Sequence, residues 1–135
     1  DEIKFLDKNI EKLAKLSTEF SVVSIVTNQP QIAMNKLSLE ELEGINNYII
    51  HYCREKSLLI DTVVWCPHHP HKGYDSENKI LKTDCFCRKP KPGMLLQLAY
   101  ERNIDLKSSL FVGDSYVDEE ASKSAGCSFI NILNL

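Results

Sequence analysis

The sequence predicts a three-layer α/β/α fold with a mostly parallel sheet. Short apolar runs rich in β-branched residues alternate with segments of helical periodicity. Strands that alternate with helices in this way form a parallel sheet covered on both faces. Polar or metal-competent residues directly follow three of the runs, which is where ligands bind in such folds.

Four buried strands and four helices account for most of the chain. The predicted strands cover residues 21–29, the part of 58–66 around Thr62–Trp65, 108–114 and 127–133. The predicted helices cover residues 6–16 with Asp7 as N-cap, a segment opened by a Ser38–Glu41 capping box, a segment with Pro92 at its first position, and 118–125 closed by Gly126.

Composition narrows the class of protein. The 135 residues are 43% hydrophobic and 26% charged, which suits one globular domain spanning residues 1–135. A net charge of −3 argues against a nucleic-acid-binding domain, since those are usually basic. No apolar run is long enough to span a membrane, and residues 1–9 do not resemble a signal peptide. We therefore expect a cytoplasmic protein.

A zinc site is predicted from four residues in one polar, proline-rich stretch. Cys66 and His68 stand two residues apart, as do Cys85 and Cys87. Three thiolates and an imidazole form a common closed tetrahedral zinc site. Because four protein ligands leave no position for water, zinc would stabilise the loop 66–87 rather than perform chemistry.

The remaining cysteines and neighbouring histidines have plainer interpretations. Cys53 and Cys127 lie in apolar segments and are expected to be small buried hydrophobes. His69 and His71 are interpreted as surface loop residues, with a substrate contact as the alternative for either.

A phosphate-binding segment follows the predicted zinc loop. Arg88 and Lys89 stand side by side, next to Pro90 and Pro92. Arg binds phosphate as a fork and Lys as a point charge, and the helix that opens at Pro92 adds its positive end. A basic run is more often a solvated surface, but the prolines and the metal loop favour a site here.

Two further strand ends carry candidate ligands. Asp114 and Asp118 follow the third strand and can hold Mg²⁺, which takes one or two carboxylates together with water and phosphate oxygens. Asp118 could instead only cap the following helix. Thr27, Asn28 and Gln29 follow the first strand and can hydrogen-bond a phosphate, although turn formation explains them equally well.

With these sets in this order, the chain resembles the haloacid dehalogenase superfamily. The segments VVSIVTNQ, CPHHP, CFCRKPKPGML and FVGDSYVDEEASKSAG are similar to the D-glycero-D-manno-heptose-1,7-bisphosphate phosphatase family and its histidinol-phosphatase relatives. The resemblance covers nearly the whole chain and implies a Rossmann-like fold with no large cap domain.

The resemblance also implies roles. Thr27 would contact the transferred phosphoryl group, Lys89 would neutralise it, and Arg88 would contact the substrate, as Asn28 and Gln29 also could. Magnesium at Asp114 and Asp118, and structural zinc, would be the metals. The implied reaction is removal of the 7-phosphate from a phosphorylated heptose through an aspartyl-phosphate intermediate.

One family feature is absent from residues 1–135. The Asp-x-Asp-Gly motif of the nucleophile does not occur, and Asp7 is followed by Asn9 and no Gly, so a helix cap is favoured for Asp7. The missing first strand would lie centrally, between the strands ending at Thr27 and Gly113. We expect a longer natural chain, omitted residues, or a strand supplied by an upstream domain or a partner chain. The fragment itself should be inactive.

Three functions stay open at this point. The first is a phosphatase acting on a small phosphorylated heptose, expected to be a monomer without nucleic-acid or membrane partners. The second is a histidinol-phosphate phosphatase. The third is a non-catalytic phosphosugar-binding domain, if the chain is complete. The change to Pro30 and the residues after it, where relatives usually carry Gly and Arg, weakens the inference about the substrate more than that about the fold.

Overall fold

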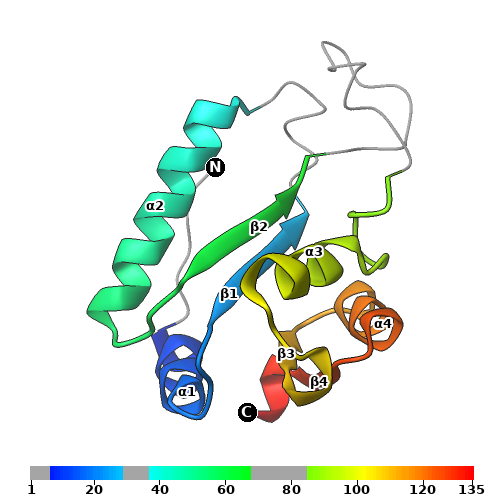
Figure 1. Cartoon of the computed structure of the whole chain (residues 1–135). Helices are drawn as coiled ribbons and strands as arrows, with labels where there is room; N and C mark the ends of the chain where they lie inside the picture. The colour runs from blue at the N-terminus through cyan, green and yellow to red at the C-terminus, as the bar shows by residue number, and fades with distance from the viewer. Residues whose placement is uncertain (1–6, 29–36, 68–84) are drawn as a thin grey trace. The chain divides into compact units, whose positions relative to one another are not determined.

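The computed structural model describes residues 7–28, 37–67 and 85–135. Helices and strands alternate along these ranges (Figure 1), which confirms the α/β class. The helices are α1 (Asp7–Ser17), α2 (Leu39–Glu55), α3 (Gly93–Arg102) and α4 (Tyr116–Ala125). The strands are β1 (Ser24–Asn28), β2 (Thr62–Cys66), β3 (Leu110–Gly113) and β4 (Ser128–Asn131).

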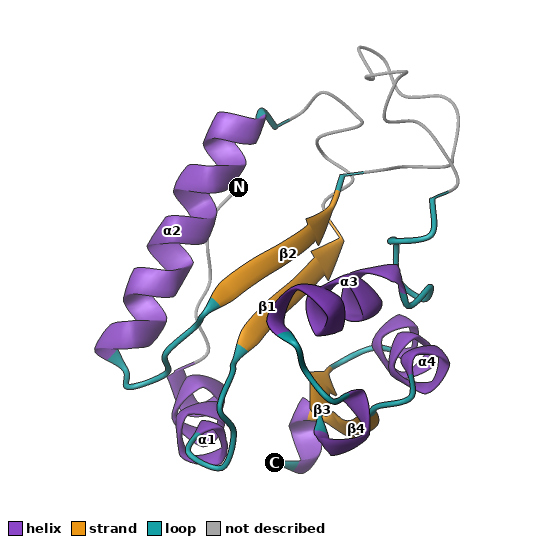
Figure 2. Cartoon of the chain, viewed as in Figure 1, coloured by secondary structure: helices purple, strands orange, loops and turns teal. Residues whose placement is uncertain are grey.

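The strands form two pairs. β1 is hydrogen-bonded to β2, and their arrows point the same way (Figure 2). β3 is parallel to β4, with Leu110 opposite Ser128 and Gly113 opposite Asn131, so α4 is the crossover helix of a βαβ unit. Within the described ranges no ladder joins the two pairs.

Several predicted boundaries need correction. β1 and β3 begin at Ser24 and Leu110, later than predicted, because residues 21–23 have no regular secondary structure and a short 3₁₀ helix precedes β3. The predicted strand 127–133 ends at Asn131, whose side chain accepts from the Leu133 N–H and opens another 3₁₀ turn. Pro92 lies one residue before α3 rather than at its first position.

The first compact group comprises residues 7–25 and 39–63 of the described chain. Its core is formed by the apolar side chains of Ile10, Cys53, Leu58 and Ile60. Polar contacts lie around this core. The Tyr52 hydroxyl donates to the Asp7 carboxylate over 2.7 Å. Asp7 lies at the start of α1, as predicted, but as its first helical residue rather than as the N-cap.

The second compact group comprises residues 26–28, 37–38, 64–67 and 85–135. Val64, Cys66, Met94 and Leu98 form its core. α4 packs against α3, β3 and β4, and Gly126 ends it in the left-handed conformation at φ 85°, as predicted. That residues 1–135 form a single domain remains a prediction.

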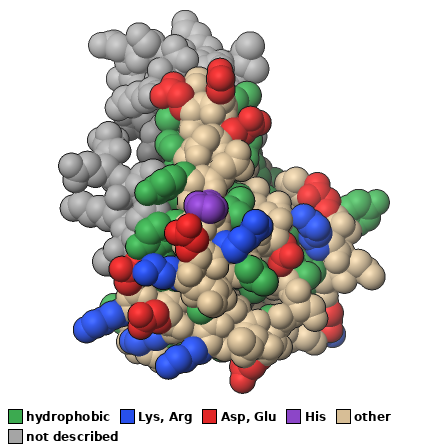
Figure 3. Space-filling model, turned by 90° about the vertical axis from the view of Figure 1, so that its left-hand side faces the viewer, with side chains coloured by type: hydrophobic (Ala, Val, Ile, Leu, Met, Phe, Trp, Pro, Cys, Tyr) green, Lys and Arg blue, Asp and Glu red, His purple; other side chains and the backbone are tan. Residues whose placement is uncertain are grey.

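Charged side chains of both signs lie on the described surface. Acidic and basic side chains are interspersed on the face shown in Figure 3. Among the described helices, none has the length and apolar character that crossing a membrane would require.

Candidate active site and thiol cluster

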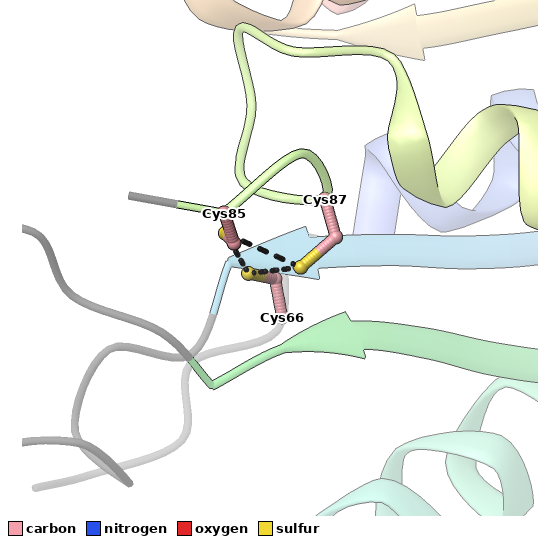
Figure 4. Close-up of side chains that lie close together, drawn as sticks. All are labelled: Cys66, Cys85 and Cys87. Carbon is pink, nitrogen blue, oxygen red and sulfur yellow. Dashed lines mark hydrogen bonds between the residues drawn. The ribbon is translucent and has the colours of Figure 1, made fainter. Parts of the chain in front are cut away.

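Three predicted zinc ligands meet in the second compact group. The Sγ of Cys66, at the end of β2, lies 2.7 Å from the Sγ of Cys87 and 3.4 Å from that of Cys85. The three sulfurs point toward one another (Figure 4). Cys66 is fully buried, and all three thiols are free of disulfides. The fourth predicted ligand, His68, lies outside the described residues, as do His69 and His71.

The main chain after Cys85 supports this thiol. The backbone N–H of Arg88 donates to the Cys85 Sγ over 3.3 Å, and the Lys91 ammonium donates to the Cys85 carbonyl over 2.9 Å. The Gly93 N–H then closes the segment on the carbonyl of Phe86 at 3.1 Å. A side chain at Gly93 would place its Cβ 2.5 Å from that carbonyl oxygen, so this turn requires glycine.

The two neighbouring thiols differ in acidity. Burial alone would raise the pKa of Cys85, but hydrogen bonds from Cys66, Cys87 and the Arg88 N–H lower it below its ordinary value. Burial raises the pKa of Cys87. The hydrogen bond from the Arg88 N–H therefore favours the thiolate form of Cys85.

Cys53 and Cys127 have a different environment. Burial raises the pKa of both thiols. Cys53 is buried as predicted, whereas Cys127 is only partly buried and donates to the Ser122 carbonyl. Neither belongs to the thiol cluster.

A nearly buried ion pair lies at the carboxyl end of β3. The Lys89 Nζ is 2.5 Å from the Asp118 Oδ1, with side-chain exposures of 13% and 6%. The ammonium also lies 5.8 Å from the centre of the Phe111 ring. Phe111 in turn packs edge-to-face on Phe129 of β4. A charge pair this far from water is tolerated only when its remaining polar atoms are also bonded.

The carboxylate oxygen of Asp118 that does not face Lys89 is also hydrogen-bonded. Its Oδ2 accepts hydrogen bonds from the backbone N–H groups of Asp114 and Ser115 at 3.3 Å each, and from the Ser115 hydroxyl at 3.0 Å. Burial alone would raise the pKa of Asp118, but Lys89 and then Ser115 and the Asp114 N–H lower it below its ordinary value. Asp118 is therefore an ionised carboxylate that both caps α4 and holds Lys89.

Asn28, at the end of β1, is hydrogen-bonded to the main chain of Lys89. The Asn28 Oδ1 accepts from the Lys89 backbone N–H at 2.9 Å, and the Asn28 Nδ2 donates to the Lys89 carbonyl at 3.2 Å. Thr27 is half-buried beside it, and its hydroxyl donates to the Asn28 carbonyl over 3.3 Å. Thr27, Lys89 and Asp114 are therefore linked through Asn28 and Asp118.

The other predicted site residues are placed as follows. Arg88 is half-buried, and Asp114 is exposed at the end of β3. Gln29 lies outside the described residues. The roles predicted for all these side chains in catalysis, substrate binding and magnesium binding remain predictions.

Three contributors to the site were missed from the sequence. Ser115 completes the capping box with Asp118, and its Ser-x-x-Asp spacing was a readable signal. Phe111 lies under Lys89, which no local pattern indicates. Gly113 leaves room for the Asp118 side chain, which lies 2.6 Å from where a Cβ would stand.

Comparison with known proteins identifies the family. The haloacid dehalogenase-like hydrolase profile matches residues 77–132. The D-glycero-beta-D-manno-heptose-1,7-bisphosphate 7-phosphatase of Pseudomonas aeruginosa is 36% identical over 133 residues, which cover 94% of this chain and 68% of that protein. This chain belongs to the heptose-1,7-bisphosphate 7-phosphatase family. The resemblance inferred from the motifs is thereby confirmed.

Other members agree with this placement. The family member of Pasteurella multocida is 36% identical over 126 residues, covering 93% of this chain and 65% of its own length. The Escherichia coli member is 30% identical and is covered to 63%. The chain thus spans about two thirds of the length of the curated relatives it matches.

Solved structures support the fold. The D,D-heptose 1,7-bisphosphate phosphatase of B. bronchiseptica, complexed with magnesium and phosphate, superposes with a TM-score of 0.72 at 29% identity over 89% of this chain and 61% of that one. A HAD-like phosphatase from Mesorhizobium loti superposes with a TM-score of 0.82 at 30% identity over 93% of this chain and 58% of that one.

Proposed function

We propose that the protein is a magnesium-dependent phosphatase that removes the 7-phosphate from D-glycero-D-manno-heptose 1,7-bisphosphate. The observation that carries the proposal is the nearly buried Lys89–Asp118 pair, bonded to the end of β1 beside Thr27. Membership of the heptose-bisphosphate phosphatase family supports the choice of substrate.

Lys89 supplies the positive charge of the site. An ammonium has three N–H donors, and Asp118 takes one of them, so two can face phosphoryl oxygens. Because Lys89 is mostly shielded from water, its attraction for a phosphate is stronger than that of a solvated lysine. Asp118 holds the ammonium in place, while Thr27 would donate its hydroxyl to the same phosphoryl group.

Asp114 is the better suited of the two predicted magnesium ligands. Its carboxylate is exposed directly after β3, whereas both oxygens of Asp118 already accept hydrogen bonds. One carboxylate with water and phosphate oxygens is a normal ligand set for Mg²⁺. Bound there, the ion would offset charge on the transferred group. Asp118 would support it by fixing the Asp114 backbone.

The thiol cluster is suited to structural zinc. Its three sulfurs lie within 4.8 Å of one another, and the Arg88 backbone N–H donates to the sulfur of Cys85. With His68 as fourth ligand, zinc would supply a fixed crosslink and no open position. The segment it would hold leads directly into Arg88 and Lys89.

The attacking group would be an aspartate, as the family resemblance implies. Residues 1–135 contain no Asp-x-Asp-Gly motif, so the proposal places the nucleophile and the acid/base aspartate outside them. The nucleophile would displace the sugar oxygen from the 7-phosphorus to form an aspartyl-phosphate, while the acid/base aspartate donates a proton to that leaving oxygen. The same aspartate would then take a proton from the water that hydrolyses the aspartyl-phosphate to free phosphate. Arg88 and Gln29 are proposed to contact the substrate, whereas both polar ends of the Asn28 side chain are bonded to the Lys89 backbone. A monomeric, cytoplasmic enzyme remains our expectation.

The test uses the natural polypeptide, with any sequence that precedes residue 1 in its gene. Phosphate release is measured with Mg²⁺ from both anomers of the heptose bisphosphate and from histidinol phosphate. We expect kcat/KM to favour the heptose by at least about 100-fold, with ³¹P NMR showing loss of the 7-phosphate. Faster release from histidinol phosphate would overturn the substrate, and phosphate binding without release would overturn the phosphatase.

A further inference from the structure

The Asn28 side chain is engaged at both of its polar ends. Its carbonyl oxygen accepts from the Lys89 N–H at 2.9 Å, and its amide nitrogen donates to the Lys89 carbonyl at 3.2 Å. Both partners are main-chain atoms of one residue, 61 positions further along the chain. Asn28 therefore fixes the backbone of Lys89 against the end of β1.

Few residue types can make this pair of contacts. An amide side chain offers an acceptor and a donor side by side, which match the N–H and C=O of one residue. Aspartate offers only acceptors when ionised, and alanine offers neither. The position at the end of β1 thus makes use of the specific chemistry of asparagine.

The other end of Lys89 is fixed by a different residue. Asp118 holds its ammonium, and the ring of Phe111 lies beneath it. A lysine side chain has four rotatable bonds and loses much rotamer freedom when it is held. If only the ammonium were held, movement of the Lys89 backbone could carry the ammonium out of the phosphoryl site. The two contacts together define its position.

We propose that Asn28 is a positioning residue: its amide clamps the main chain of Lys89 and thereby places the ammonium for phosphoryl transfer. This inference rests on the proposed function, because a phosphate is what the ammonium would meet. It gives Asn28 a role through Lys89, distinct from the phosphate contact suggested by its place after a strand.

The clamp itself is tested by amide hydrogen exchange at Lys89, which needs no turnover. In the unaltered protein the Lys89 N–H should exchange at least about tenfold more slowly than an exposed, unbonded amide. Asn28→Ala should accelerate this exchange by about tenfold, and Asn28→Asp should retain part of the protection through its acceptor oxygen. Asn47→Ala, an exposed amide on α2, is the matched control and should change nothing at Lys89.

Kinetics separate positioning from substrate contact. In the natural polypeptide, Asn28→Ala should lower kcat by roughly tenfold to a hundredfold and leave KM within about threefold. Asn28→Asp should recover part of the loss. A merely structural tie would lower the melting temperature while leaving kcat of the folded enzyme unchanged.

Three results would overturn the inference. They are unprotected exchange of the Lys89 N–H in the unaltered protein, equal exchange in the protein with Asn28→Ala, and an unchanged kcat in folded Asn28→Ala, whether or not KM rises. If Asn28→Ala does not fold, amide exchange at Lys89 in the unaltered protein and in Asn28→Asp tests the clamp instead. If the unaltered enzyme releases no phosphate, the proposed function fails, whereas the exchange result still reports on the clamp.

Discussion

The two compact groups differ in what they bury. The first, residues 7–25 and 39–63, encloses apolar side chains such as Ile10 and Leu58, and its Tyr52–Asp7 hydrogen bond is exposed. The second encloses Asp118 and Ser122, which are 4% and 0% exposed, together with the Cys66 thiol. Both groups contain helices packed on strands, yet only the second buries a charge.

The difference indicates where function is concentrated. Burying an ionised carboxylate is costly unless it is paired and hydrogen-bonded, and replacing such a pair by apolar residues is often neutral or stabilising. Stability alone therefore gives little reason for the Lys89–Asp118 pair. Its contacts are explained by the need for a fixed ammonium, whereas the first group is explained by apolar packing.

The largest effect is expected from removing the buried cation. In the natural polypeptide, Lys89→Met should lower kcat by at least about 100-fold, because the phosphoryl charge loses its counterion. It also leaves Asp118 buried and unpaired, which should destabilise the fold by about 3–5 kcal/mol. Steady-state kinetics and urea unfolding measure the two effects. The exposed Lys107→Met is the matched control, and unchanged kcat in Lys89→Met would remove Lys89 from the mechanism.

Metal removal should affect the second group more than the first. Elemental analysis should find about one zinc per chain, and a chelator should lower the melting temperature. Amide exchange should then rise in residues 85–93 more than in α2. Cys66→Ser should lose the metal, whereas Cys127→Ser should keep it. Absence of zinc from protein purified without chelator would contradict the ligand assignment.

Acid should weaken the second group through Asp118. The pKa of this carboxyl is lowered in the folded state, so its stabilisation is present above the unfolded pKa of about 4 and is lost as pH falls through the folded value. Urea unfolding between pH 7 and pH 3 should show this loss. Asp118→Asn should flatten the acid limb, and Glu40→Gln on the exposed start of α2 controls for charge. An equally steep acid limb in Asp118→Asn would contradict the assignment.

Replacing glycine by alanine should change the stability of the protein in opposite directions in the two groups. A Cβ at Gly113 would lie 2.6 Å from the Asp118 side chain, so Gly113→Ala should destabilise the protein by about 1–3 kcal/mol. Gly44, inside α2, has nothing within 4 Å of its Cβ position, and Gly44→Ala should stabilise by about 0.5–1 kcal/mol. Thermal unfolding compares them, and the same sign for both would break the distinction.

The fold was predictable where periodicity is strong. Apolar runs and capping signals indicated every described helix and strand, and Gly126 was correctly expected to close α4. Boundaries were less accurate, since nothing local shows that residues 21–23 lie outside β1 or that Pro92 stands just outside α3. The site was predictable as a set of strand ends, because parallel strands bring their carboxyl ends to one edge.

The sequence by itself determined the α/β class, the family and the types of side chain at the site, because these depend on residue patterns within short segments. Only the tertiary structure decided that Asp118 pairs with Lys89, that Asn28 holds the same lysine by its main chain, and how closely the sulfurs of the predicted ligands Cys66, Cys85 and Cys87 approach one another. These contacts join residues 19 to 61 positions apart. Their geometry depends on how strands and helices pack, which no local pattern encodes.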